Sequence, residues 1–250
     1  MKPIEHAKKR NYAEELEKRT AFIQKVLAES GAAGIVYGNS GGKDSALVGI
    51  LCKTACENTI GIQMPCGSKR NFNEDLQDAL SVAEQFSITT KTFDLTEIKA
   101  EFLDLLHRQL GLTPAAVFNM APRLRMATLY AAAASENALV AGTGNASEGY
   151  MGYFTKWGDG AFDFNPIADL TVTEVYEFLA FLNAPKAILE KKPSAALYEG
   201  QTDEQEMGIT YARIDQFLLR GEADEADQKL IDEFHKKSEH KRRMPPVYGG

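Results

Sequence analysis

The segment with the clearest chemical content in this sequence is short, polar and rich in glycine: Gly38-Asn39-Ser40-Gly41-Gly42-Lys43-Asp44-Ser45. It follows the apolar run 34–37 and precedes a helical pattern that begins at Ala46. Glycines let the backbone approach an anion closely, and the free N–H groups of a helix N-terminus point at it. A strand, a glycine loop and a helix start therefore predict a phosphate site, with two serine hydroxyls as further donors.

Asp44 adds a metal ion to this prediction. A carboxylate repels phosphate unless a cation lies between them, so the loop implies Mg²⁺ as well as phosphate. The loop is not a Walker A motif, because Lys43 is followed by Asp44 rather than by serine or threonine. A second carboxylate comes from Glu148, which ends the glycine-containing segment 142–148. Mg²⁺ favours one or two carboxylates beside phosphate oxygens, so we expect Asp44 and Glu148 to hold one ion together.

Strand and helix patterns alternate through the first 141 residues. Apolar runs predict strands at 33–38, 59–64, 88–93 and 138–141. Helical periodicity predicts helices at 5–30, 44–56, 72–86, 95–110 and 117–135. This alternation is typical of an α/β fold with a doubly wound parallel sheet flanked by helices. Ligands of such sheets bind at the carboxyl ends of the strands, where 38–45 and 142–148 both fall.

The segment 142–168 breaks the alternation. It is rich in glycine and aromatic residues, which predicts a long, irregular and functional segment rather than a helix. Helices are expected again at 171–182, 210–220 and 223–240, and Thr171-x-x-Glu174 is a capping-box pattern at the start of the first. We find no linker, so we expect residues 1–250 to form a single domain.

Composition argues against several classes of protein. The net charge of −7 argues against a nucleic-acid binder, which would normally carry a basic face. No apolar run approaches the roughly 20 residues of a membrane span, and the N-terminus lacks the apolar core of a signal peptide. Cys52, Cys56 and Cys66 form no Cys-x-x-Cys pair, so we expect thiols in a cytoplasmic protein rather than a zinc or disulfide site.

Several further segments resemble the ammonia-dependent NAD synthetase family, and the similarity runs from about residue 10 to the tail. They include residues 119–126, 142–148, 192–194, 200–204 and 239–242, and the most specific is Gly152-Tyr153-Phe154-Thr155-Lys156-Trp157-Gly158-Asp159-Gly160. The resemblance implies the ATP pyrophosphatase fold, also called adenine nucleotide alpha hydrolase-like. It also implies a homodimer that converts deamido-NAD⁺ to NAD⁺ with ATP, Mg²⁺ and ammonia. The nicotinate carboxylate would attack the α-phosphorus of ATP, and ammonia would then displace AMP from the acyl-adenylate.

Matching positions give individual residues their expected roles under this resemblance. The ATP site would contain Gly38, Ser40, Gly41, Gly42, Lys43, Asp44, Ser45, Thr143 and Ser194. The deamido-NAD⁺ site would contain Asn119, Arg123, Lys156, Asp163, His240 and Lys241. Asp44, Glu148 and Lys156 would be the catalytic residues, with both carboxylates as metal ligands. Arg123 and Arg125 point to different sides of a helix, and the resemblance selects Arg123 for the site.

Three positions depart from the family pattern. Val172 stands where the family usually has a phosphate-binding lysine, and Ala196 stands where many bacterial members have aspartate. Ser194 replaces a common threonine but keeps the hydroxyl group. These changes argue against the usual binding of ATP phosphates near positions 172 and 196. We expect Lys43 to supply part of the missing positive charge.

Three other functions would use the same loop. A tRNA thiolase would favour a cysteine pair and a basic face, and neither is seen in the sequence; a GMP-synthetase-like amidase would carry its own dimerisation and glutaminase segments. A nucleotide sensor that binds ATP without turnover would permit Val172 and Ala196, but the presence of Asp44, Glu148, Lys156 and Asp163 argues against it. The chain has no room for a glutaminase domain, so we expect ammonia as the direct donor, either free or from a separate glutaminase subunit.

Overall fold

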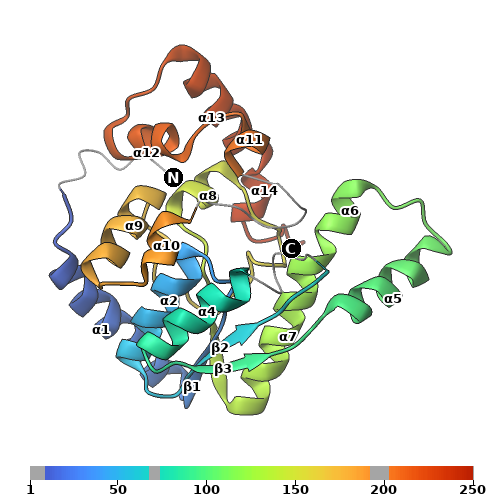
Figure 1. Cartoon of the computed structure of the whole chain (residues 1–250). Helices are drawn as coiled ribbons and strands as arrows, with labels where there is room; N and C mark the ends of the chain where they lie inside the picture. The colour runs from blue at the N-terminus through green and yellow to red at the C-terminus, as the bar shows by residue number, and fades with distance from the viewer. Residues whose placement is uncertain (1–8, 68–73, 192–202, 250) are drawn as a thin grey trace.

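The computed structural model describes residues 9–67, 74–191 and 203–249 (Figure 1). Within these residues the strands form one parallel sheet in the order β3-β2-β1-β4. The strands are β1 (Gly34–Gly38), β2 (Thr59–Gln63), β3 (Thr89–Thr92) and β4 (Ala138–Ala141). Every end lies within one residue of the predicted end, so the four predicted strands and the fold class are confirmed.

The strand order creates a switch point between β1 and β4. The chain moves from β1 to β2 and β3 on one side and returns to place β4 on the other side of β1. Tyr37 pairs with Ala141 in register, so the loops that follow these two strands leave the sheet at the same edge. This is the position at which open α/β sheets bind ligands.

Helices cover both faces of the sheet (Figure 1). One face carries α1 (Tyr12–Ser30), α2 (Lys43–Ala55), α4 (Glu74–Gln85) and α9 (Val172–Phe181). The other carries α7 (Met120–Glu136), which packs against β1 and β4 and contacts α5 (Thr96–His107). The remaining described helices are α6 (Pro114–Phe118), α8 (Ala146–Met151), α10 (Lys186–Glu190), α11 (Asp203–Met207), α12 (Tyr211–Arg220), α13 (Glu225–Lys237) and α14 (Glu239–Arg242). No helix among the described residues is long and apolar enough to cross a membrane.

The prediction of an irregular segment was wrong for residues 146–151, which form α8. Asn145 caps this helix and forms a capping box with Glu148, and Gly152 ends it in the left-handed conformation (φ 68°). Two further predicted boundaries need correction. Helix α1 begins at Tyr12 rather than residue 5, and the last predicted helix is divided at Ser238 into α13 and α14. The capping box predicted at Thr171 is confirmed.

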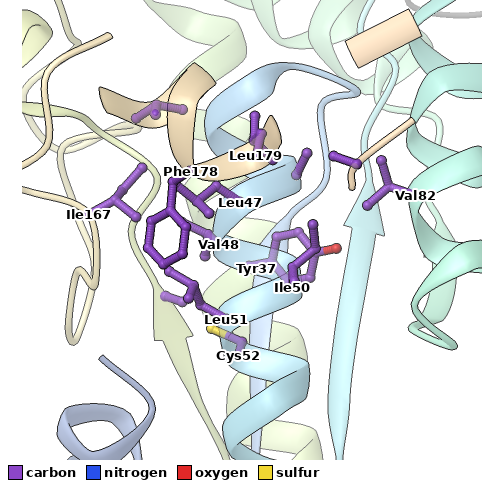
Figure 2. Close-up of a cluster of buried hydrophobic side chains, with 14 of the residues drawn as sticks. Tyr37, Leu47, Val48, Ile50, Leu51, Cys52, Val82, Ile167, Phe178 and Leu179 are labelled. Atoms are coloured by element: carbon purple, nitrogen blue, oxygen red, sulfur yellow. The ribbon is translucent and has the colours of Figure 1, made fainter. Parts of the chain in front are cut away.

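Helix α2 lies inside the protein and is buried on nearly all sides. Leu47, Val48 and Leu51 pack in one cluster with Phe178 and Leu179 of α9 (Figure 2). Glycine is required where α2 passes the buried ring of Tyr37, because a Cβ at Gly49 would lie 2.3 Å from the tyrosine oxygen. The core therefore fixes α2, and with it the loop at its N-terminus.

Phe178→Ala and Phe181→Ala form a matched pair on α9 that tests this core. The Phe178 side chain is fully buried and Phe181 is 46% exposed. We expect Phe178→Ala to lower the free energy of unfolding by about 3–5 kcal/mol. We expect Phe181→Ala to lower it by less than about 1 kcal/mol. Urea denaturation measures both, and equal losses would contradict this description of the core.

Candidate functional site

A cavity of about 1140 Å³ lies where β1, β2 and β4 end. Its walls come from segments far apart in the chain: 38–45, 62–65, 140–149, 151–162 and 237–244. The glycine loop after β1 and the loop after β4 both line it, as their positions in the parallel sheet predict.

The glycine loop is shaped for an anion. Gly41 adopts φ 70°, and a Cβ there would lie 2.1 Å from the carbonyl oxygen of Asp75, so only glycine fits. Gly42 precedes α2, and among the described side chains none caps the N-terminus of this helix. The hydroxyls of Ser40 and Ser45 lie 3.1 Å apart in the same loop. Backbone N–H groups and two hydroxyls are thus collected where a phosphate could bind.

One residue, Asn145, orients both predicted metal ligands. Its side-chain amide donates to Asp44 Oδ1 at 3.0 Å, and its backbone N–H donates to Glu148 Oε2 at 3.2 Å. Its side-chain oxygen accepts a hydrogen bond from the Glu148 backbone at 3.0 Å. One oxygen of each carboxylate is therefore held by Asn145, and the other oxygen is left to face a shared partner.

That partner is the ammonium group of Lys43. Its Nζ lies 2.7 Å from Asp44 Oδ2 and 3.9 Å from Glu148 Oε1. The Lys43, Asp44 and Glu148 side chains are only 5%, 15% and 18% exposed. Two carboxylate oxygens that meet at one cation form the kind of donor set that Mg²⁺ accepts, so the residues fit the predicted metal.

Burial and neighbouring charges raise the pKa values of both Glu148 and Lys43. Burial and then the charge of Asp44 raise the pKa of Glu148 to about 8, and Lys43 partly offsets this rise. Burial lowers the pKa of Lys43, but the charges of Asp44 and Glu148 outweigh it and raise this pKa overall. Lys43 therefore keeps its positive charge at neutral pH, and it favours the ionised form of Glu148 against burial and the charge of Asp44.

On the opposite side of the cavity, residues 152–156 of the glycine- and aromatic-rich segment are hydrogen-bonded to helix α14. Lys241 Nζ donates to the carbonyl oxygens of Gly152 and Phe154, both at 2.7 Å. Lys156 Nζ donates in return to the carbonyl oxygen of His240 at 2.7 Å. These bonds fix α14 against the aromatic segment and leave its basic residues at the rim.

The cavity brings most of the predicted site residues together. It is lined by Gly38, Ser40, Gly42, Lys43, Asp44, Ser45, Asn119, Thr143, Glu148, His240 and Lys241. Gly41 supports the loop from behind, against Asp75. Ser194 and Ala196 lie outside the described residues.

Three predicted dinucleotide contacts do not line the cavity of this chain: Arg123, Lys156 and Asp163. Arg123 is exposed on α7, whereas Arg125 lines the cavity and donates to the carbonyl oxygen of Met64 at 3.0 Å. The Asp163 carboxylate accepts from the backbone of Val140 and from the hydroxyl of Tyr130, which anchors the segment after β4. Their contacts with a dinucleotide stay predictions.

Two residues that support the site were missed from the sequence. Lys191 Nζ donates to the carbonyl oxygen of Gly41 at 3.0 Å and pairs with Asp75 and Asp78, so it fixes the glycine loop. No local sequence pattern indicates this role of Lys191, because its partners are more than a hundred residues away. Asn145 could have been found from the capping-box spacing Asn145-x-x-Glu148.

The surroundings of Val172 agree with the expected loss of a positive charge there. Val172 is buried in an apolar cluster with Tyr150, Met151 and Tyr211. Val172 does not line the cavity, and the Lys43 ammonium lies 5.7 Å from the centre of the Tyr211 ring. The role of Lys43 in supplying the missing charge stays a prediction.

The parallel sheet, the glycine loop and the carboxylate pair define an α/β protein with the ATP pyrophosphatase-like fold. The family profile described as NAD synthase matches residues 15–245. The chain therefore belongs to the NAD synthase family.

Individual relatives match over nearly the whole chain. The NH(3)-dependent NAD(+) synthetase of Carboxydothermus hydrogenoformans is 44% identical over 240 residues, which cover 95% of this chain and 98% of that protein. A solved structure of NMN synthetase from Francisella tularensis is 36% identical, with TM-score 0.90, and covers 96% of this chain and all of that one. A structure of NH3-dependent NAD synthetase from Campylobacter jejuni is 32% identical, with TM-score 0.79 and the same coverage.

Asn145→Ala tests whether this side chain orients the carboxylates, and Thr210→Ala is the control. Each removes a helix N-cap and should lower the free energy of unfolding by about 1 kcal/mol. Only Asn145→Ala should weaken binding of Mg²⁺–ATP, by about 10–100-fold, because Asp44 loses its side-chain amide donor and the Glu148 backbone N–H loses its acceptor. Isothermal titration calorimetry measures the affinity. Unchanged binding in Asn145→Ala would show that the carboxylates need no such support.

Proposed function

We propose that this protein catalyses the ATP-dependent amidation of deamido-NAD⁺ by ammonia, giving NAD⁺, AMP and pyrophosphate. The observation that carries the proposal is that the glycine loop, the Asp44–Glu148 pair and the segment 151–162 line one cavity. Full-length relatives described as NH(3)-dependent NAD(+) synthetases support the same reaction.

The proposed chemistry has two steps. A nicotinate carboxylate oxygen attacks the α-phosphorus of ATP, and the bond from that phosphorus to the departing pyrophosphate breaks. Ammonia then attacks the carbonyl carbon of the acyl-adenylate, AMP leaves with the shared oxygen, and the nitrogen loses a proton. The backbone N–H groups at the start of α2 would stabilise the pyrophosphate as its charge develops.

Asp44 and Glu148 would hold Mg²⁺ in this reaction. The ion, when bound, would neutralise negative charge that builds up on the leaving pyrophosphate. The support is the donor set itself, since Oδ2 of Asp44 and Oε1 of Glu148 already face one positive charge. Two carboxylates leave room in an octahedral shell for phosphate oxygens and water.

The size and charge of the cavity support two nucleotide substrates. A volume of about 1140 Å³ exceeds the roughly 300–1,000 Å³ of a site for one small molecule. At its far side His240, Lys241, Arg242 and Arg243 line the wall, where they would attract the phosphates of a dinucleotide. We assign Lys156 to the same substrate, since it is bonded to the His240 backbone.

We propose a homodimer through the apolar face that α5 and α6 present. The exposed apolar side chains of these two helices and of the loop between them are Ile98, Phe102, Leu105, Leu110 and Phe118. Both helices extend from the body of the protein beside α7 (Figure 1). Large exposed apolar patches mark protein interfaces. Because Arg123 is exposed on α7, in a dimer it would contact the dinucleotide bound by the second subunit.

We also propose a cytoplasmic location, supported by the cysteines. Cys52, Cys56 and Cys66 are all free thiols, as expected in a reducing compartment.

A second candidate is the amidation of nicotinate mononucleotide to NMN. The structure described as NMN synthetase matches this chain with TM-score 0.90, against 0.79 for the structure described as NH3-dependent NAD synthetase. The reacting carboxylate and the use of ATP would be the same, so the candidates differ only in whether an adenylate half of the substrate is bound.

A direct assay tests both candidates with ATP, Mg²⁺, ammonium and either acid. We expect NAD⁺ and AMP from deamido-NAD⁺, with a higher kcat/KM than for nicotinate mononucleotide. Asp44→Asn and Glu148→Gln should each lower kcat by about 10²–10³-fold, because transition-state charge loses its support. Glu136→Gln, which changes a surface carboxylate paired with Lys91, is the matched control and should keep full activity.

The other outcomes of this assay are equally specific. Faster turnover of nicotinate mononucleotide would establish the second candidate instead. ATP binding with no amide from either acid would indicate a nucleotide sensor, and the proposed function would then be wrong.

A further inference from the structure

We propose that Lys43 is a built-in counter-ion of the Asp44–Glu148 pair, which keeps free divalent cations out of this site until ATP arrives. The inference rests on the proposed function, because it takes the two carboxylates as the Mg²⁺ ligands. It assigns Lys43 a role beyond phosphate binding, since it makes metal binding dependent on the nucleotide.

The Lys43 ammonium and a metal ion would use the same carboxylate oxygens. Asn145 occupies Asp44 Oδ1 and Glu148 Oε2. The remaining oxygens, Asp44 Oδ2 and Glu148 Oε1, lie 2.7 and 3.9 Å from Lys43 Nζ. A divalent cation bound by both carboxylates must replace Lys43 at these two atoms, so the two cations compete.

In the nucleotide-free protein, a metal ion would leave the Lys43 ammonium in poor surroundings for a charge. Its side chain is 5% exposed and its ammonium lies 5.7 Å from the centre of the Tyr211 ring. A metal ion that took the carboxylates would leave this ammonium beside a double positive charge, in surroundings that screen charge weakly. Binding of the metal alone is therefore opposed.

ATP would remove this opposition to metal binding. Lys43 is the first residue of α2 and belongs to the loop that lines the phosphate side of the cavity. A triphosphate would offer the ammonium new anionic partners, and the carboxylates would be released to the metal. Each charge then keeps a partner, so nucleotide and metal should bind cooperatively, each raising the affinity of the other by the same factor.

Lys53 provides a control on the same helix. Its side chain is 13% exposed, and its Nζ pairs with Glu57 beyond the other end of α2. This carboxylate is not a predicted metal ligand. Removing the Lys53 charge should therefore leave metal binding at the Asp44–Glu148 pair unchanged.

The experiment measures Mn²⁺ binding to the full chain without nucleotide, from the electron paramagnetic resonance signal of the free ion. We expect Lys43→Met to bind one Mn²⁺ with a Kd at least about tenfold lower than the wild type, because a nearby like charge is removed. Lys43→Arg and Lys53→Met should behave as the wild type. Lys43→Gln replaces Lys43→Met as the neutral variant if the latter does not fold, as judged by urea denaturation.

Adding Asp44→Asn to Lys43→Met should abolish the tighter binding, which assigns it to this pair of carboxylates. Equal Mn²⁺ affinity in the wild type and a folded neutral variant would overturn the inference, as would tight binding that survives Asp44→Asn. The assay for NAD⁺ separates this result from the proposed function. NAD⁺ formation with unchanged Mn²⁺ affinity rejects the inference alone, and tighter Mn²⁺ binding in a protein that makes no NAD⁺ rejects the function alone.

Discussion

The meeting of Asp44 and Glu148 at one positive charge is the interaction on which the rest of this structure depends. Two carboxylates in a largely buried place repel each other, and burial alone disfavours their charged forms. They remain close because Asn145 binds one oxygen of each and Lys43 pairs with the other. A cation stabilises such a pair in its charged form, and the identity of that cation links the resting protein to its proposed chemistry.

The fold positions these groups through rigid elements rather than through the loops alone. Parallel pairing of β1 with β4 brings the loops before α2 and α8 to one edge of the sheet. Helix α2 is fixed by the core around Phe178. Helix α8 is tied to its neighbours by Asp215, whose carboxylate accepts hydrogen bonds from Ser147 and from Thr173. Both carboxylates therefore extend from the first turns of anchored helices, which restricts their movement.

The sheet and the two loops that carry Asp44 and Glu148 could be predicted from the sequence, for physical reasons. Buried parallel strands are continuous apolar runs, so β1 and β4 were recognisable, and their order placed both loops at one edge. Helix α8 was missed because the many glycines around it were given more weight than its local cap at Asn145. The position of Lys43 could not be predicted, because its contact with Glu148 depends on how two distant helices meet. Lys191 was missed for the same reason.

The most direct measurement is a crystal structure of the protein with Mn²⁺ and a non-hydrolysable ATP analogue, with the metal located by anomalous scattering. We expect an anomalous peak bound by Asp44 Oδ2 and Glu148 Oε1, with the Lys43 ammonium moved from these oxygens to the phosphates. A peak at any other position, or an ammonium that stays between the two carboxylates while the metal is bound elsewhere, would contradict it.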